Sequence, residues 1–165
     1  STRGHRTDNY NPTNKTINLS ESVYASASIA AAAVAAHETG HAIQDAYGYA
    51  PLRLRSALVP VISFASQWSF LLIIAGILLI NTLPAIFWAG IALIALSAIF
   101  SLITLPVEYN ASRRAMQWLE SSGTLHGQAL RQAGTALQWA ARTYLVAALS
   151  AIATLLYYIG FARRN

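Results

Sequence analysis

The sequence predicts an all-α integral membrane protein. Hydrophobic residues make up 55% of the 165 residues and charged residues only 10%, whereas an average soluble domain contains roughly 25% charged residues. Three long apolar segments each approach or exceed the ~20 residues with which a helix crosses a bilayer. Because no charge run or Pro/Gly/Ser-rich linker interrupts the chain, we expect a single domain over residues 1–165.

Residues 1–19 form a polar segment that is rich in Asn and Thr. Asn11-Pro12 indicates a turn, and the alternation of polar and apolar residues over Lys15–Leu19 predicts a short exposed strand. The segment begins without Met and lacks the apolar stretch of a signal peptide. We therefore expect it to be the cut end of a longer protein.

A helix is predicted over residues 20–46, with no interruption except Gly40. Ser20 is a favourable N-cap, and Glu21 suits the first turn. Residues 25–36 are rich in Ala, only weakly apolar and shorter than a membrane span. We expect this helix to pack on the membrane helices, because small side chains allow close approach.

Transmembrane helices are predicted at residues 57–80, 84–105 and 138–161, with Arg142 as the one charged residue among them. Residues 106–137 are more polar and predict a helical excursion from the membrane. This excursion and the 20–46 helix share the side of the membrane that holds most basic residues, namely Arg3, Arg6, Lys15, Arg53, Arg55, Arg113, Arg114, Arg131 and Arg142. The positive-inside rule predicts that this side is cytoplasmic.

The charge balance and the absence of Cys exclude several classes of function. The formal charge is +5, but a nucleic-acid-binding protein gathers its basic residues into a patch. Here they flank apolar segments, so we expect a lipid bilayer and no nucleic acid as the partner. Without Cys there are no disulfides, thiolate metal sites or cysteine nucleophiles. His and carboxylate side chains remain as metal ligands.

The sequence His37-Glu38-Thr39-Gly40-His41 matches the pattern H-E-x-x-H. Residues four apart lie on the same face of a helix, so His37 and His41 can bind one zinc ion together. Glu38 lies beside this pair, where its carboxylate can accept a proton from a water molecule. A surface helix with three unrelated polar residues is the alternative, and burying them beside an Ala-rich helix without a function would be costly.

Catalytic zinc takes a third protein ligand, which this motif does not provide. Gln44 and Ala50 stand where a longer form of the motif would have its further ligand, so a distant carboxylate is needed. Glu108 is the strongest candidate, because it follows Pro106 at the end of a membrane span and an ionisable group there suggests a function. An interfacial ion pair with Arg113 or Arg114 remains the alternative. The other acidic candidates are Asp8, Glu21, Asp45 and Glu120.

Four stretches together resemble the YugP-like family of bacterial membrane neutral zinc metallopeptidases. They are residues 35–44, 48–55, 104–115 and Thr143-Tyr144. The resemblance implies a bacterial plasma membrane location, His37 and His41 as ligands, Glu38 as the catalytic residue and Glu108 as the third ligand. More distantly, the chain is similar to the HtpX and CAAX-type proteases, which carry an Asp where this chain has Ser112. Ser112 could support a ligand or lie on the helix surface.

These observations predict a zinc-dependent endopeptidase of the membrane that binds one Zn²⁺ through His37, His41 and Glu108. Glu38 would act as the general base, and the substrate would be a peptide or a membrane protein. The alternative is a non-catalytic zinc-binding membrane scaffold or a transport protein. The sequence predicts neither the cleavage preference nor the oligomeric state.

Overall fold

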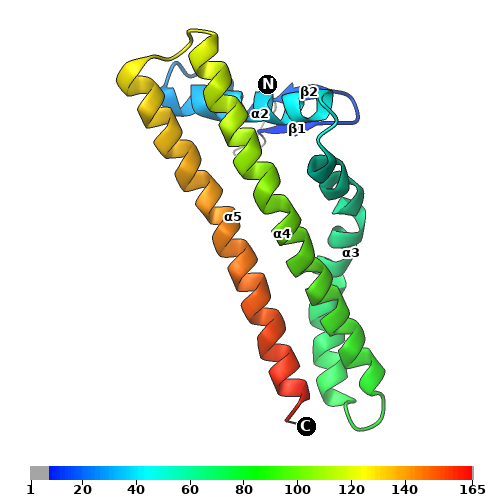
Figure 1. Ribbon diagram of the computed structural model, residues 1–165. Helices are drawn as coiled ribbons and strands as arrows, with labels where there is room; N and C mark the ends of the chain where they lie inside the picture. Colours follow the sequence, from blue (N-terminus) through cyan, green and yellow to red (C-terminus); the bar gives the residue numbers. More distant parts are fainter. Residues whose placement is uncertain (1–7, 165) are drawn as a thin grey trace. The chain divides into compact units, whose positions relative to one another are not determined.

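The computed structural model describes residues 8–164, which fold into two short strands and five helices. Their order is β1 (Asn9–Asn11), β2 (Thr16–Asn18), α1 (Glu21–Tyr24), α2 (Ile29–Ala46), α3 (Ala50–Leu78), α4 (Pro84–Ser121) and α5 (Gly127–Ala162). Figure 1 shows α4 and α5 as uninterrupted helices. The predicted α-helical class with a short N-terminal strand is confirmed.

Three helices are long and apolar enough to cross a membrane, as predicted: α3, α4 and α5. Two of them extend well beyond the expected spans, because residues 106–137 continue α4 and begin α5 around a turn. At 1.5 Å per residue, the 38 residues of α4 are about 57 Å long, nearly twice the apolar thickness of a bilayer. The excursion is therefore the polar end of two candidate membrane helices and not a separate element.

The predicted continuous helix over residues 20–46 is wrong, because the chain leaves the helical conformation between α1 and α2. The Ser20 hydroxyl does not cap α1 but donates to the carboxylate of Asp8, 3.0 Å from Oδ1. Ser28 forms the new N-cap, since its Oγ accepts the backbone N–H of Ala31 at 3.1 Å. A Ser side-chain hydrogen bond thus begins the second helix.

Residues 8–53 and 106–143 form one compact unit. Its core lies where the Ala-rich part of α2 packs on α4 and α5, through Ala33, Ala36, Ala115, Leu119, Ala133 and Leu137. The strands β1 and β2 pair antiparallel, with Tyr10 opposite Ile17. Only β2 lies in the segment predicted to be extended; β1 precedes the turn.

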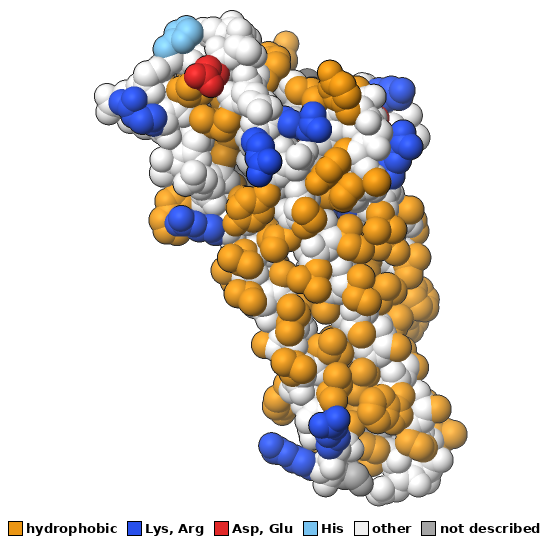
Figure 2. Space-filling view, in the orientation of Figure 1, with side chains coloured by type: hydrophobic (Ala, Val, Ile, Leu, Met, Phe, Trp, Pro, Cys, Tyr) orange, Lys and Arg blue, Asp and Glu red, His pale blue; other side chains and the backbone are white. Residues whose placement is uncertain are grey.

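Residues 54–105 and 144–164 form the second unit. Gly76 of α3 packs against the backbone of Phe87 in α4, and Ile73, Phe87 and Ile91 form a small core with residues of α5. Most other large apolar side chains face outward, as Figure 2 shows along these helices. An outer surface of this kind suits lipid and not water. The expectation of one domain over residues 1–165 stays a prediction.

Candidate metal centre

The helix α2 places both His residues of the motif on the face that packs against α4. Gly40 lies between them and is buried. A Cβ atom at this position would overlap the carbonyl oxygen of Ala111 and lie only 3.0 Å from its carbonyl carbon. The absence of a side chain at Gly40 therefore lets the two helices come close enough for His37 and His41 to reach residues of α4.

Glu108 of α4 completes the group. Its side chain is 1% exposed, and its Oε2 lies 3.0 Å from Nε2 of His37 and 3.5 Å from Nε2 of His41. The candidate ligand atoms of the three residues all lie within 4.8 Å of one another. The structure thus brings together the three predicted ligands from positions 71 residues apart in the chain.

A chain of hydrogen bonds fixes the orientation of the His41 ring. Arg114 Nε, which can only donate, bonds to Asn110 Oδ1 at 2.8 Å. Gln44 Nε2 donates to the same oxygen at 3.0 Å and to the carbonyl of Val107 at 2.8 Å. The remaining Gln44 oxygen, Oε1, therefore accepts a hydrogen bond from Nδ1 of His41 at 2.9 Å. In neutral His41 the lone pair must then be on Nε2, the nitrogen that faces Glu108.

His37 has a similar but weaker support. Its Nδ1 lies 3.2 Å from Oγ of Ser112, one helical turn beyond Glu108. The half-buried hydroxyl of Ser112 is therefore in contact with the ring. This arrangement is the kind of outer support that metal-binding His residues usually have.

Glu38 lies beside the three candidate ligands and is itself buried, with 8% of its surface exposed. Burial raises the pKa of its carboxyl group above the ordinary value, and the charge of Glu108 adds to this effect. The nearby His41 and His37 and the backbone N–H of Tyr10 act in the opposite direction. Glu38 is thus a partly desolvated carboxyl group next to a possible ion site.

The hairpin of β1 and β2 is fastened to α2 at this point. The Tyr10 hydroxyl donates to Oδ2 of Asp45 at 2.7 Å, and its backbone N–H reaches Glu38. Burial, together with the hydrogen bond and charge of Asp45, raises the pKa of Tyr10 to about 12. One residue of the hairpin therefore contacts α2 both at Glu38 and near its C-terminus.

The remaining acidic candidates either accept hydrogen bonds elsewhere or are exposed. Asp8 accepts hydrogen bonds from Ser20, and Asp45 accepts one from Tyr10. Glu21 and Glu120 are exposed. The alternative ion pair between Glu108 and Arg113 or Arg114 is not formed among the described residues, where the carboxylate pairs with the two His side chains.

Comparison with known proteins identifies the family. The model of a family described as "Putative neutral zinc metallopeptidase" matches residues 1–163. The chain belongs to this family. It is also 43% identical over 157 residues to the "Putative membrane protease YugP" of Bacillus subtilis (strain 168). The aligned region covers 95% of this chain and 69% of that protein. No solved structure matches the chain.

The donor set of this member of the family fits zinc. Two imidazoles and one carboxylate are a known ligand set of catalytic zinc. Ligands about 2.0–2.1 Å from a tetrahedral ion are roughly 3.3 Å apart, and the measured separations are 3.0 and 3.5 Å. The lone pair on Nε2 of neutral His41 faces a carboxylate oxygen, and a cation bound between these two acceptors would satisfy both.

Several residues that shape the site were not predicted from the sequence. Gln44 entered the prediction only as a position where a third ligand is missing, and Asn110 and Tyr10 were given no role. The spacing of Gln44, three residues after His41, could have indicated a partner on the same helix face. The contacts of Asn110 and Tyr10 depend on the packing of distant segments and had no such local signal.

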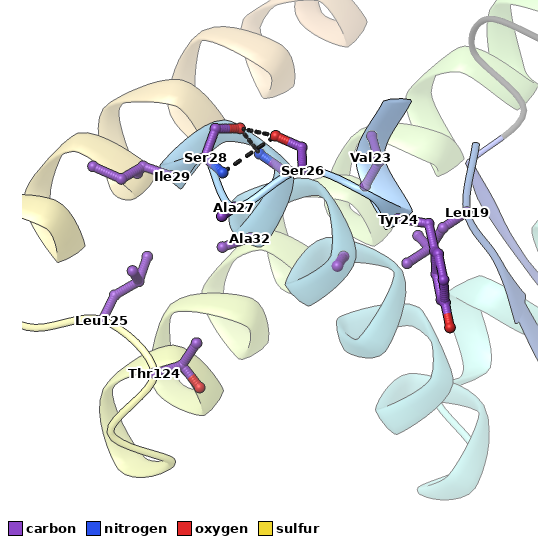
Figure 3. Close-up of a pocket in the computed structure, with 12 residues that line it drawn as sticks. Leu19, Val23, Tyr24, Ser26, Ala27, Ser28, Ile29, Ala32, Thr124 and Leu125 are labelled. Carbon is purple, nitrogen blue, oxygen red and sulfur yellow. Dashed lines mark hydrogen bonds between the residues drawn. The ribbon is translucent and has the colours of Figure 1, made fainter. Parts of the chain in front are cut away.

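A cavity of about 360 Å³ lies along the N-terminal half of α2. Figure 3 shows it with Leu19 and Tyr24 on one side and Thr124 and Leu125 on the other, beside the hydrogen-bonded Ser26 and Ser28. Ala31 and Ala35 of α2 also line it. Residues 31, 35 and 38 lie on one stripe of a helix, so Ala31 and Ala35 share a face of α2 with Glu38, which does not itself line the cavity.

Proposed function

We propose that this protein is a zinc-dependent endopeptidase of the membrane that hydrolyses peptide bonds of a peptide or membrane-protein substrate. The observation that carries the proposal is the meeting of His37, His41 and Glu108 with the buried Glu38 beside them. Membership of a zinc metallopeptidase family and the likeness to a membrane protease support it.

One Zn²⁺ would be held by His37, His41 and Glu108. Zinc supplies Lewis acidity, which activates water near neutral pH and polarises the scissile carbonyl. Gln44 and Ser112 keep the two imidazole rings in position through their Nδ1 atoms. The ligand geometry is therefore set before a substrate binds, as efficient catalysis requires.

Glu38 is the general base of the proposed reaction. Its carboxylate accepts the proton of the attacking water and then delivers it to the nitrogen of the leaving amine. A raised pKa makes Glu38 a stronger base for the first step, and a pKa closer to the working pH lets the same group act as base and then as acid. No particular residue is assigned to the oxyanion.

The substrate is proposed to lie along the Glu38 face of α2. The cavity over Ala31 and Ala35 is lined mainly by apolar and small side chains, so it suits an apolar side chain of the substrate. The apolar outer surfaces of α3, α4 and α5 support a place in the bacterial plasma membrane. The distribution of Arg in the sequence supports an active site on the cytoplasmic side.

The substitution Glu38→Gln tests the proposal, because it removes the base and leaves all three ligands in place. Purified Glu38→Gln protein should retain one zinc per chain by elemental analysis and cleave an unstructured fluorogenic peptide library at least 10²-fold more slowly than wild type. The exposed Glu120→Gln variant is the matched control and should keep both properties.

The substitution Glu108→Ala separates the proposed enzyme from a scaffold or a transport protein. We expect it to lose both zinc and cleavage, since it removes a ligand. A protein that binds zinc through Glu108 but never cleaves peptides would be the non-catalytic scaffold. Unchanged cleavage in the Glu38→Gln protein would exclude Glu38 as the base.

A further inference from the structure

A second cavity, of about 420 Å³, lies between the polar ends of α4 and α5. We name it the α4–α5 cavity. Its volume falls within the roughly 300–1,000 Å³ of small-molecule sites. Two guanidinium groups line it, Arg113 from α4 and Arg142 from α5, together with Tyr109, Ser112 and Gln138, and no acidic residue does so. The lining therefore offers many hydrogen-bond donors and two positive charges.

Among residues 8–164, neither guanidinium forms an ion pair with a carboxylate. Glu108, the nearest acidic residue in the sequence to Arg113 on α4, pairs instead with His37 and His41. The neighbouring Arg114 differs, since it bonds to Asn110 and lies over the ring of Tyr47. Arg113 and Arg142 thus keep donors for an external anion. Guanidinium groups bind phosphate, as they bind carboxylate, through two parallel N–H bonds, so a phosphate group is an anion that this pair suits.

Arg142 is held in place from one side. Its guanidinium carbon lies 4.5 Å from the centroid of the exposed Trp139 ring, one turn earlier on α5. Stacking on the aromatic face restricts the planar group and leaves its N–H edges available to a ligand. A Trp beside an Arg is also typical of the boundary between lipid and water.

The sequence on either side of the cavity indicates which phosphate compound binds. On α5 a stretch without charged residues begins at Thr143, directly after Arg142, and continues to Ala162. On α4 a stretch of the same kind ends at Val107, two residues before Tyr109. The cavity therefore lies at the point where both helices change from polar to lipid-compatible sequence. A ligand with a phosphate head and apolar chains matches this change.

We propose that the α4–α5 cavity binds the headgroup of an anionic phospholipid, with Arg113 and Arg142 holding its phosphate. Met116 and Leu137 provide apolar contacts within the cavity. Gly134 lets Met116 approach α5, since a Cβ atom there would lie 3.0 Å from Cε of Met116. Lipid binding needs no catalytic activity, so it can be tested separately from the proposed peptidase function.

Native mass spectrometry of the full chain tests this proposal. The protein is equilibrated in mixed micelles with equal amounts of phosphatidylglycerol and phosphatidylcholine, and the lipids that stay bound are counted. We expect one phosphatidylglycerol per chain to be retained preferentially. Each Arg near an anionic lipid contributes about fivefold in affinity, so Arg113→Gln/Arg142→Gln should bind it roughly thirtyfold more weakly.

Arg131→Gln is the matched control. Arg131 lies on the same face of α5, about 16 Å from Arg142 along the helix, and does not line the cavity. It removes one charge and should leave lipid retention unchanged. All three Arg residues are exposed, so none of the variants disturbs the core.

Four results would overturn the proposal. Equal retention of the two lipids, or a double variant that binds like wild type, would exclude a headgroup site. Displacement of phosphatidylglycerol by the same concentration of inorganic phosphate would indicate a site for a free anion. Displacement by a peptide with a free C-terminal carboxylate, but not by its amidated form, would indicate a subsite for the peptide substrate.

Discussion

The close contact of α2 and α4 at Gly40 leads to the sharpest prediction of this structure. In Gly40→Ala the new methyl carbon would overlap the carbonyl oxygen of Ala111 and lie 3.0 Å from its carbonyl carbon. Carbon atoms pack best at roughly 3.5–4.0 Å. The contacted atoms belong to backbone and cannot rotate away, so α2 and α4 must separate by roughly 0.5–1 Å.

This displacement is large for a metal site and modest for the fold. Metal–ligand distances tolerate only about 0.2 Å, while His37 and His41 belong to one helix and Glu108 to the other. We expect zinc affinity to fall at least ~10-fold, as when an outer support of a ligand is lost. Overpacking costs about 1–3 kcal/mol, of which the better helix propensity of Ala offsets ~0.5–1 kcal/mol.

Zinc content of the purified protein, measured after dialysis against a competing chelator, checks this prediction. Gly160→Ala is the control, because Gly160 also lies inside a helix and a Cβ atom there meets nothing within 4 Å. It should keep full zinc and equal or higher thermal stability. Full zinc retention in Gly40→Ala at wild-type affinity would refute the inferred close approach of α2 and α4.

Three further variants examine the support of the site and of the fold. Gln44→Leu removes the hydrogen-bond acceptor of His41 Nδ1 and should weaken zinc binding about 10–100-fold. The control Gln128→Leu, at an exposed position, should leave zinc binding unchanged. Equal zinc affinity of the two variants would contradict the role of Gln44. Tyr10→Phe should lower the unfolding free energy by about 0.5–1.5 kcal/mol through loss of its bond to Asp45. In the wild-type protein the tyrosinate absorbance of Tyr10, identified as the part missing in Tyr10→Phe, should titrate with a pKa of about 12. Because this pKa exceeds the ordinary 10, the stabilisation from Tyr10 is complete below pH 10 and is lost as the pH rises through 12. A titration midpoint of Tyr10 at pH 10 would contradict the hydrogen bond to Asp45. Gly76→Ala would collide with Phe87 and should lower the melting temperature without changing zinc content, so that loss of zinc here would mean that the two units are coupled.

The ligands could be predicted from the sequence because their signals are local. His37 and His41 are one turn apart on a helix, and Glu108 is an isolated ionisable residue at the end of an apolar segment. Gly40 could not be recognised in the same way. Its importance comes from a contact with Ala111, which no local pattern predicts.

The boundaries of the elements were harder to predict for the same reason. Ser20 has the pattern of an N-cap, but its hydroxyl is bound by Asp8 from the other end of the hairpin. Apolar sequence predicts where α4 and α5 can cross a bilayer, but not that both continue as helices beyond it. α2 packs on those extensions through its Ala residues, a long-range contact that the apolar pattern does not indicate.

Glu38 and Glu108 both contribute negative charge to the metal site, but we expect only Glu108 to be needed for zinc binding. Two neutral imidazoles and the Glu108 carboxylate carry a total charge of −1, so a divalent cation would leave +1, which the carboxylate of Glu38 offsets. Glu38→Gln and Glu108→Gln each remove one negative charge from a buried position. If charge balance alone retained the metal, both variants would lose it equally. If coordination retains it, Glu108→Gln loses zinc while Glu38→Gln keeps it, so the pair separates the two causes.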